Sequence, residues 1–245
     1  MKWSREYSVN INDVDVNGIA PVSALMRFMQ DAANREMKAD GPSFDELYSR
    51  GLTFVLCRVS ISSYAPLHAH DNITVETWAC ESKGVQFERC FRILREGIIV
   101  AEAVSVWALI GINDKKLHRV GEIENDYCID AMLELDLPVR IRIPDDVQLS
   151  LKGERTVEYA DIDMNGHMNN THYPDILCGY LGTGMKGVRV ISAAMSFADE
   201  APLGDSVKYY SGSGEDGVYY IRAQRGDGKT NVTAEIILEK IGGEK

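Results

Sequence analysis

The sequence contains two copies of one pattern, and this duplication limits the folds open to it. The stretch DVDVNGIAPV at residues 13–22 returns as DIDMNGHMNN at residues 161–170, and β-rich runs follow each copy. A turn repeats as well, since YAPLHAHDNITVETW at residues 64–78 resembles EAPLGDSVKYYS at residues 200–211. A period of roughly 140 residues is far longer than the periods of solenoid repeats. The chain is therefore expected to fold as two related domains rather than as a stacked array.

Each copy is expected to combine one helix with an antiparallel sheet. In the first copy, residues 21–37 carry apolar side chains at three- and four-residue steps, which is typical of an amphipathic helix. Runs with single-face alternation follow, and an antiparallel sheet that packs its apolar face on a helix belongs to the α+β class. The expected strands are residues 53–65, 72–81, 85–96 and 98–112 in the first copy and 154–159, 188–198, 206–214, 218–225 and 231–241 in the second, where an apolar segment at 171–182 precedes the last four.

The repeat also suggests where the domains begin and end. Residues 1–112 form the first expected domain and residues 151–245 the second. Between them, residues 113–150 are rich in charge and show no clear period. We expect this segment to be a linker that crosses from one domain to the other.

Composition excludes several classes of protein. The chain has 26 Lys and Arg residues against 37 Asp and Glu, a net charge of -11, which argues against a general nucleic-acid binder. Its five cysteines form no CxxC pair, so reduced thiols are favoured over a disulfide framework or a zinc ribbon. The sequence opens without an apolar signal-peptide core, and the most apolar segment, residues 98–112, is too short to span a bilayer. We therefore expect a cytoplasmic protein without a membrane span.

The repeated D-x-D-x-N-G loop has two structural interpretations. It matches the start of a calcium-binding EF-hand, but the twelfth position, which needs a bidentate Glu, is Ala24 in one copy and His172 in the other. A turn is the better interpretation, because Asp and Asn side chains bond to nearby backbone N–H groups and Gly supplies a positive φ. The second copy differs by having His167 in place of Ile19. Chemistry is therefore expected to centre on His167.

Residues 161–173, DIDMNGHMNNTHY, resemble the signature of the acyl-acyl carrier protein thioesterases of plants and their bacterial relatives. The resemblance implies two tandem hot dog domains, each a long helix wrapped by an antiparallel β-sheet. It also implies hydrolysis of the thioester of fatty acyl-acyl carrier protein, which releases free fatty acid. In that family the second Asp, the Asn and the His of the signature form the active site with a Glu from the sheet. Carried over, the catalytic residues are Asp163, Asn165, His167 and Glu200.

The resemblance leaves parts of the chemistry open. One inserted residue in the matching segment keeps Asp199 as an alternative to Glu200. The position after this Glu is often Cys in the family but is Ala201 here, so no cysteine nucleophile is expected there. Either Glu200 or Asp163 acts as base or nucleophile, and backbone N–H groups that follow Gly166 are expected to stabilise the oxyanion.

The resemblance also implies where the acyl chain binds. Its pocket is expected in the first domain, between helix and sheet, where the first copy of the loop forms a degenerate site. Each buried methylene contributes about 0.8 kcal/mol, so side chains along the pocket set chain-length selectivity. The preferred length and saturation cannot be read from the sequence. Candidates to tune them are Met26, Phe28 and Met29 on the first helix.

The implied partner is acyl carrier protein, which is acidic like this chain, so docking needs a local basic patch. No cofactor and no metal are implied, and a homodimer is left open. Alternative functions are an acyl-CoA thioesterase of the hot dog superfamily, a non-catalytic acyl-binding hot dog module and a hot dog dehydratase. The basic candidates in the linker are Lys115, Lys116, Arg119, Arg140 and Arg142.

Overall fold

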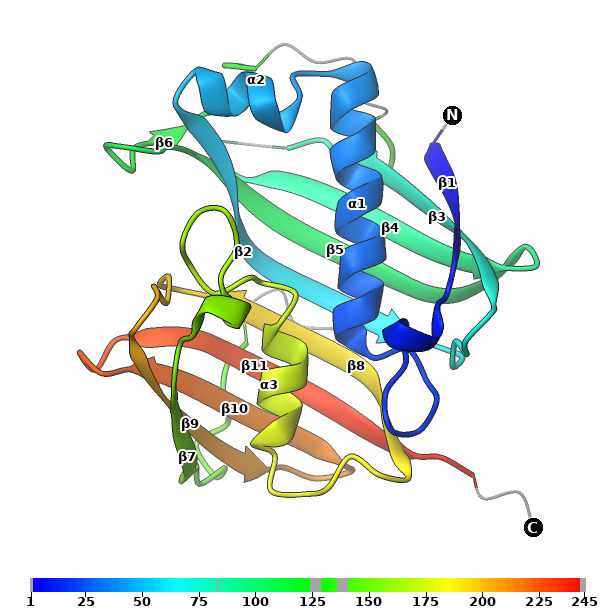
Figure 1. Cartoon of the computed structure of the whole chain (residues 1–245), viewed down its shortest axis with the longest axis vertical. Coiled ribbons are helices and arrows are strands. Elements are labelled where there is room, and N and C mark those ends of the chain that lie inside the picture. The colour runs from blue at the N-terminus through cyan, green and yellow to red at the C-terminus, as the bar shows by residue number, and fades with distance from the viewer. Residues whose placement is uncertain (1, 83, 124–128, 136–140, 243–245) are drawn as a thin grey trace.

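The computed structural model describes residues 2–82, 84–123, 129–135 and 141–242. In these residues the strands form one sheet that runs through the whole molecule (Figure 1). The first half comprises β1 (Trp3–Ser8), α1 (Val22–Asp40), α2 (Phe44–Ser49), β2 (Leu52–Ser63), β3 (Asn72–Ala79), β4 (Phe87–Arg95), β5 (Ile98–Gly111) and β6 (Leu117–His118). The second half comprises β7 (Ser150–Thr156), α3 (Tyr173–Gly179), β8 (Val188–Phe197), β9 (Ser206–Ser213), β10 (Val218–Arg225) and β11 (Thr230–Lys240).

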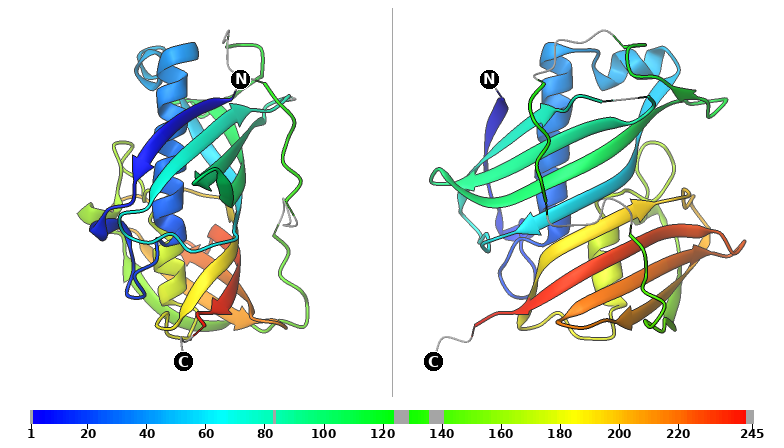
Figure 2. Two further views of the ribbon diagram at one scale, coloured as in Figure 1. Left: turned by 90° about the vertical axis from the view of Figure 1, so that its right-hand side faces the viewer. Right: turned by 180° about the vertical axis from the view of Figure 1, so that it is seen from behind.

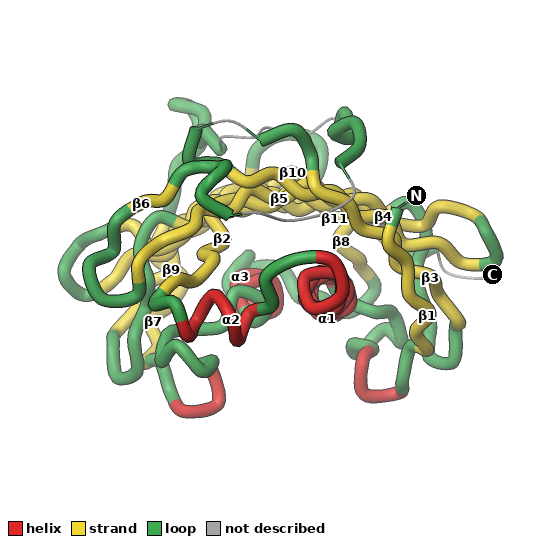
Figure 3. The backbone as a smooth tube through the Cα atoms, turned by 90° about the horizontal axis from the view of Figure 1, so that it is seen from above, coloured by secondary structure: helices red, strands yellow, loops and turns green. Residues whose placement is uncertain are grey.

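The order of the strands shows the duplication directly. It runs β1-β3-β4-β5-β2 in the first half and β8-β11-β10-β9-β7 in the second. If β7 to β11 are matched in chain order to β1 to β5, the second half has the strand order of the first half in reverse. The halves join where β2 pairs antiparallel with β8, from Arg58 opposite Ser196 to Ser62 opposite Ser192. Seen from above, the sheet arches over the helices, which all lie on its concave face (Figure 3). This is the α+β arrangement that the repeat predicts.

Helix α1 forms much of the first half's core. It follows Pro21, whose fixed φ suits a helix start, and its last turn ends where the Gly41 N–H bonds to the Met37 carbonyl at 3.2 Å. Its buried face packs on the sheet through apolar side chains at three- and four-residue steps, as predicted. The buried apolar residues of α1 are Val22, Ala24, Leu25, Met26, Met29, Ala32, Ala33 and Met37.

The two halves differ in their helices. Helix α3 has seven residues, whereas α1 has nineteen, and α2 has no counterpart between α3 and β8. The glycine-rich stretch GYLGTGMKG at residues 179–187 explains the early end of α3, because glycine is a poor helix former. None of the helices in the described residues is long and apolar enough to cross a bilayer.

Part of the linker lies on the convex face of the sheet, opposite the helices (Figure 2). The indole N–H of Trp78 donates to the carbonyl of Ala131 at 2.9 Å, and the backbone N–H of Leu133 donates to Cys90 Sγ at 3.3 Å. Leu133 and Leu135 pack on a small apolar cluster around Trp78. Residues 131–135 of the expected linker are thus attached to the first half's sheet.

Candidate active site

The loop between β7 and α3 is a tight turn built by its own side chains. Asp163 Oδ1 accepts the backbone N–H of Asn165 at 2.8 Å, and its carbonyl accepts the N–H of Gly166 at 3.0 Å. Gly166 has a φ of +78°, in the left-handed region that favours glycine. The backbone N–H of Asp163 then donates to the carbonyl of His167 at 3.0 Å. Asp163 therefore holds the turn that presents His167.

A short backbone pairing brings His167 to the carboxylate predicted from the sequence. His167 forms an antiparallel bridge with Pro202, and the N–H of Met168 donates to the carbonyl of Ala201 at 2.9 Å. The segment that follows β8 is thereby fixed beside the loop. As a result, His167 Nε2 lies 3.3 Å from Glu200 Oε2.

Glu200, and not Asp199, is the carboxylate beside His167. Asp199 Oδ1 lies 3.3 Å from a guanidinium nitrogen of Arg225, and its Oδ2 lies 3.4 Å from Lys229 Nζ. Asp199 thus belongs to an ion-pair cluster on the neighbouring hairpin. Of the two carboxylates that the inserted residue left as alternatives, Glu200 is therefore the one that the structure places beside His167.

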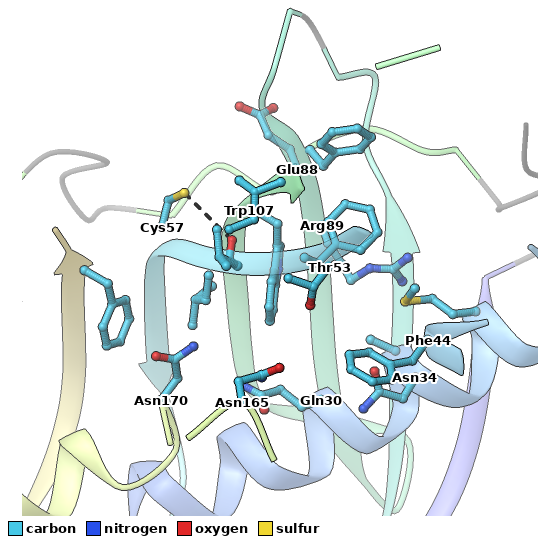
Figure 4. Close-up of a pocket in the computed structure, with 18 of the residues that line it drawn as sticks. Gln30, Asn34, Phe44, Thr53, Cys57, Glu88, Arg89, Trp107, Asn165 and Asn170 are labelled. Atoms are coloured by element: carbon cyan, nitrogen blue, oxygen red, sulfur yellow. Dashed lines mark hydrogen bonds between the residues drawn. The ribbon is translucent and has the colours of Figure 1, made fainter. Parts of the chain in front are cut away.

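The loop opens onto a cavity of about 1150 Å³ that both halves line (Figure 4). All four predicted site residues line this cavity. Most of its lining residues come from the first half, where α1, α2, β2, β4 and β5 contribute Gln30, Ala33, Asn34, Met37, Phe44, Tyr48, Phe54, Leu56, Phe87, Arg89 and Trp107.

Met26, Phe28 and Met29, the α1 residues named as candidates to tune chain length, do not line this cavity. Met26 and Met29 belong to the main core cluster, and Phe28 packs against it. The ring of Phe28 also packs in a tilted orientation against the ring of Tyr7, with centroids 5.5 Å apart. The reason is the helical phase, since Met26 and Met29 lie on the stripe of α1 that faces the sheet, while the adjacent stripe faces the cavity. That adjacent stripe consists of Gln30, Ala33, Asn34 and Met37.

Backbone donors for an oxyanion are fewer than the sequence suggested. Four N–H groups that follow Gly166 are already bonded to protein oxygen atoms, and α3 begins only at Tyr173. The side chains of Asn165 and Asn170, by contrast, line the cavity (Figure 4). The side-chain amides are therefore among the N–H donors that the cavity wall offers. The engaged N–H groups are those of Met168, Asn169, Thr171 and His172.

The first copy of the loop uses the same residues for a structural purpose. The side chain of Asn17 donates to the carbonyls of Met185 at 2.8 Å and Val188 at 2.9 Å, and it accepts the N–H of Gly187 at 2.8 Å. These bonds attach the first loop to the second half. Ile19, buried at 6% exposure, occupies the place of His167.

Tyr173, at the end of the signature, is buried beside the cavity at 2% exposure. Its ring packs edge-on against Phe197, with centroids 5.3 Å apart. Burial raises the pKa of Tyr173 to about 12, so its hydroxyl stays protonated at neutral pH. Tyr173 therefore anchors the start of α3 next to the site as a neutral group.

The basic residues of the linker divide between two environments. Lys115 lines the cavity, and its Nζ lies 3.4 Å from Glu200 Oε2, a contact that nothing in the sequence indicated. Lys116 instead pairs with Asp114 at 3.5 Å, and Arg119 and Arg142 are exposed. Arg140 lies outside the described residues, and carrier-protein docking at this segment stays a prediction. In the described residues, no group of three or more His, Cys, Asp or Glu side chains is placed to hold a metal ion.

Comparison with known proteins shows which protein family the chain belongs to. Residues 1–128 match the model of the acyl-ACP thioesterase N-terminal domain, and residues 145–240 match that of the acyl-ACP thioesterase C-terminal domain. The chain belongs to the acyl-ACP thioesterase family. The resemblance noted in the sequence is thereby confirmed.

Relatives within the acyl-ACP thioesterase family are distant in sequence. A chloroplastic oleoyl-acyl carrier protein thioesterase 2 of Arabidopsis thaliana is 26% identical over 194 residues, which cover 70% of this chain and 52% of the relative. A chloroplastic palmitoyl-acyl carrier protein thioesterase of the same plant is 23% identical over 185 residues, covering 70% and 45%. The chain thus spans about half the length of the curated relatives it matches.

Solved structures of the acyl-ACP thioesterase family share the fold along the whole chain. An acyl-ACP thioesterase from Bacteroides thetaiotaomicron superposes with a TM-score of 0.86 at 21% identity, covering 96% of this chain and 97% of that one. A 12:0-ACP thioesterase from Umbellularia californica gives a TM-score of 0.81 at 18% identity, covering 98% and 97%. The fold class that the resemblance implied, two tandem hot dog domains, is confirmed, and it agrees with the two related domains predicted from the duplication.

Proposed function

We propose that this chain hydrolyses the thioester of fatty acyl-acyl carrier protein and releases a free fatty acid. Membership of the acyl-ACP thioesterase family supports this proposal. The main observation behind the proposal is that His167 Nε2 lies 3.3 Å from Glu200 Oε2 on the wall of a large cavity. An imidazole, a carboxylate and amide donors beside an apolar cavity are the groups that hydrolysis of an acyl thioester needs.

The proposed reaction begins with a water molecule beside Glu200. The carboxylate takes a proton from this water while the water oxygen attacks the carbonyl carbon of the thioester. The negative charge that develops on the carbonyl oxygen is stabilised by the side-chain amide of Asn165, which faces the cavity (Figure 4). Asp163 supports the reaction indirectly, because it holds the turn that carries Asn165 and His167.

Collapse of the tetrahedral intermediate breaks the carbon–sulfur bond. The proton taken by Glu200 passes through His167 Nε2, 3.3 Å away, to the departing sulfur, so the products are a carboxylic acid and a thiol. A thiol has an ordinary pKa of about 8.5, so sulfur leaves with less help from an acid than an alkoxide or amine needs. Direct attack by the Glu200 carboxylate is the second mechanism that this geometry allows.

We propose a division of labour between domains at residues 1–112 and 151–245. The first domain supplies most of the cavity wall and so holds the acyl chain, while its own loop carries Ile19 in place of a histidine. The second domain supplies the reacting groups. A cytoplasmic location stays a prediction, as does the homodimer that the sequence left open.

Steady-state hydrolysis of a panel of acyl-acyl carrier proteins of different chain length tests the proposal. His167→Ala and Glu200→Ala should each lower kcat by about 10²–10⁴ while circular dichroism shows an intact fold. Asp199→Ala, which alters the neighbouring carboxylate paired with Arg225 and Lys229, should keep most of the turnover. Full turnover in both the His167 and the Glu200 variants would refute the proposed site.

The same panel separates the alternatives. An acyl-CoA thioesterase would hydrolyse acyl-CoA with a kcat/KM at least equal to that for acyl-acyl carrier protein. A non-catalytic binding module would bind acyl chains without forming thiol, and a dehydratase would act on a 3-hydroxyacyl substrate instead. The contact between His167 and Glu200 favours hydrolysis over simple binding, since binding an alkyl chain needs no imidazole beside a carboxylate.

A further inference from the structure

Among the described residues of the first half, only Lys115 forms an ion pair with Glu200, the proposed reacting carboxylate. Its Nζ lies 3.4 Å from Glu200 Oε2, although the two residues are 85 positions apart. The same oxygen lies 3.3 Å from His167 Nε2. Two nitrogen groups from different halves therefore converge on one carboxylate oxygen.

The turn that carries Lys115 is defined by backbone bonds. The N–H of Lys115 donates to the carbonyl of Gly111 at 3.0 Å, and the N–H of Gly111 donates to the carbonyl of Lys116 at 2.9 Å. A Cβ at Gly111 would lie 2.1 Å from Asp114 Oδ1, so a larger residue there would displace the Asp114 side chain. Lys115 itself has a φ of +54°, a conformation that costs a non-glycine residue about 1 kcal/mol. The backbone thus holds Lys115 in a disfavoured conformation at the point where its side chain reaches Glu200.

Both members of this pair are partly open to solvent. The Lys115 side chain is 55% exposed and that of Glu200 is 42% exposed. An exposed ion pair contributes less than about 1 kcal/mol to folding stability. Its effect is instead expected on orientation, because a half-exposed glutamate samples several rotamers unless a partner fixes it. Occupation of Oε2 by Lys115 and His167 leaves Oε1 for water.

We propose that Lys115 is a positioning residue that fixes Glu200 for proton transfer, so that catalysis depends on a contact between the two halves. This inference rests on the proposed function, in which Glu200 receives the proton of the attacking water. Lys115 does not touch the reacting atoms. It acts by restricting the carboxylate to the orientation in which Oε1 faces the bound thioester.

The test measures kcat and KM with two thioesters of the same acyl chain, one on acyl carrier protein and one on N-acetylcysteamine, which has no carrier protein. Lys115→Met should lower kcat about tenfold or more with both substrates, with KM changed less than about threefold and the melting temperature nearly unchanged. Lys115→Arg should recover part of the loss. The matched control is Lys229→Met, since Lys229 lies at the same 3.4 Å from the adjacent carboxylate of Asp199, and its kcat should stay unchanged.

A combined variant distinguishes positioning from an independent effect. Adding Lys115→Met to Glu200→Ala should cause no further loss, because the lysine acts only through that carboxylate. An unchanged kcat in Lys115→Met would overturn the inference, as would an increase in KM confined to the carrier-protein substrate, which would make Lys115 a docking residue. Failure of the wild-type protein to hydrolyse either substrate would instead overturn the proposed function.

Discussion

Replacing Glu36 by alanine should destabilise the protein by about 3–5 kcal/mol, the cost of removing one partner of a buried ion pair. Glu36 on α1 is fully buried and pairs with Arg89 on β4, whose side chain is 11% exposed. The guanidinium also donates to Thr77 Oγ1 at 3.0 Å. The substitution therefore removes a buried carboxylate that faces the guanidinium between helix and sheet.

This free energy corresponds to a measurable change in melting temperature. Unfolding entropies of about 2.1 cal/mol/K per residue give roughly 0.5 kcal/mol/K for a chain of this length. The melting temperature of Glu36→Ala should then fall by about 6–10 °C. Calorimetry and urea unfolding should agree on the loss, with an unchanged m-value.

The double substitution Glu36→Met, Arg89→Met should restore stability to within about 1 kcal/mol of the wild-type protein. Burial raises the pKa of the Glu36 carboxyl above its ordinary value even with Arg89 beside it, which indicates that attraction does not fully offset desolvation. The control is Arg35→Ala, which removes an exposed ion pair with Asp31 on the same helix and should cost less than about 1 kcal/mol. A loss below about 1 kcal/mol in Glu36→Ala, or a double variant as unstable as the worse single one, would refute this reasoning.

Three further perturbations test other parts of the structure. Ala33→Phe, on the cavity-facing side of α1, should shift the preferred acyl chain towards shorter lengths, whereas Met29→Leu in the core should leave the chain-length profile unchanged. Asn17→Ala should lower stability by about 1–3 kcal/mol in urea unfolding because three bonds across the halves are lost, whereas Asn165→Ala should lower kcat and leave stability within about 0.5 kcal/mol. Burial raises the pKa of the Cys178 thiol to about 12. Iodoacetamide at pH 8 should therefore label Cys178 roughly a thousandfold more slowly in the folded protein than in urea. Equal labelling rates, measured by mass spectrometry, would contradict this burial.

The duplication predicted more of the fold than any local pattern did. The repeat indicated two related halves. Within each half, alternation of apolar and polar residues along the strands indicated an antiparallel sheet with one buried face. The short α3 was harder to foresee, since the repeat suggests an equal helix while the glycines at residues 179–187 stop it. Comparison of the two loops also isolated His167, which the structure places beside Glu200.

Contacts between distant segments were beyond the reach of the sequence. Lys115 meets Glu200 only because a hairpin of one half lies over a loop of the other, and no periodicity encodes that approach. The cavity wall on α1 was missed for a related reason. Gln30 and Asn34 are polar and would be assigned to a solvated face, whereas they border the cavity in the folded chain.

Both copies lie in one polypeptide and pair centrally through β2 and β8, so neither copy is bound by the symmetry of a homodimer. In a homodimer every mutation appears on both sides of the twofold axis, so two identical sites must change together. Here a substitution occurs once. One loop therefore carries the aliphatic Ile19 and bonds to the other half through Asn17, while the other loop carries His167 beside Glu200. Covalent fusion thus permits specialisation that a symmetric assembly forbids.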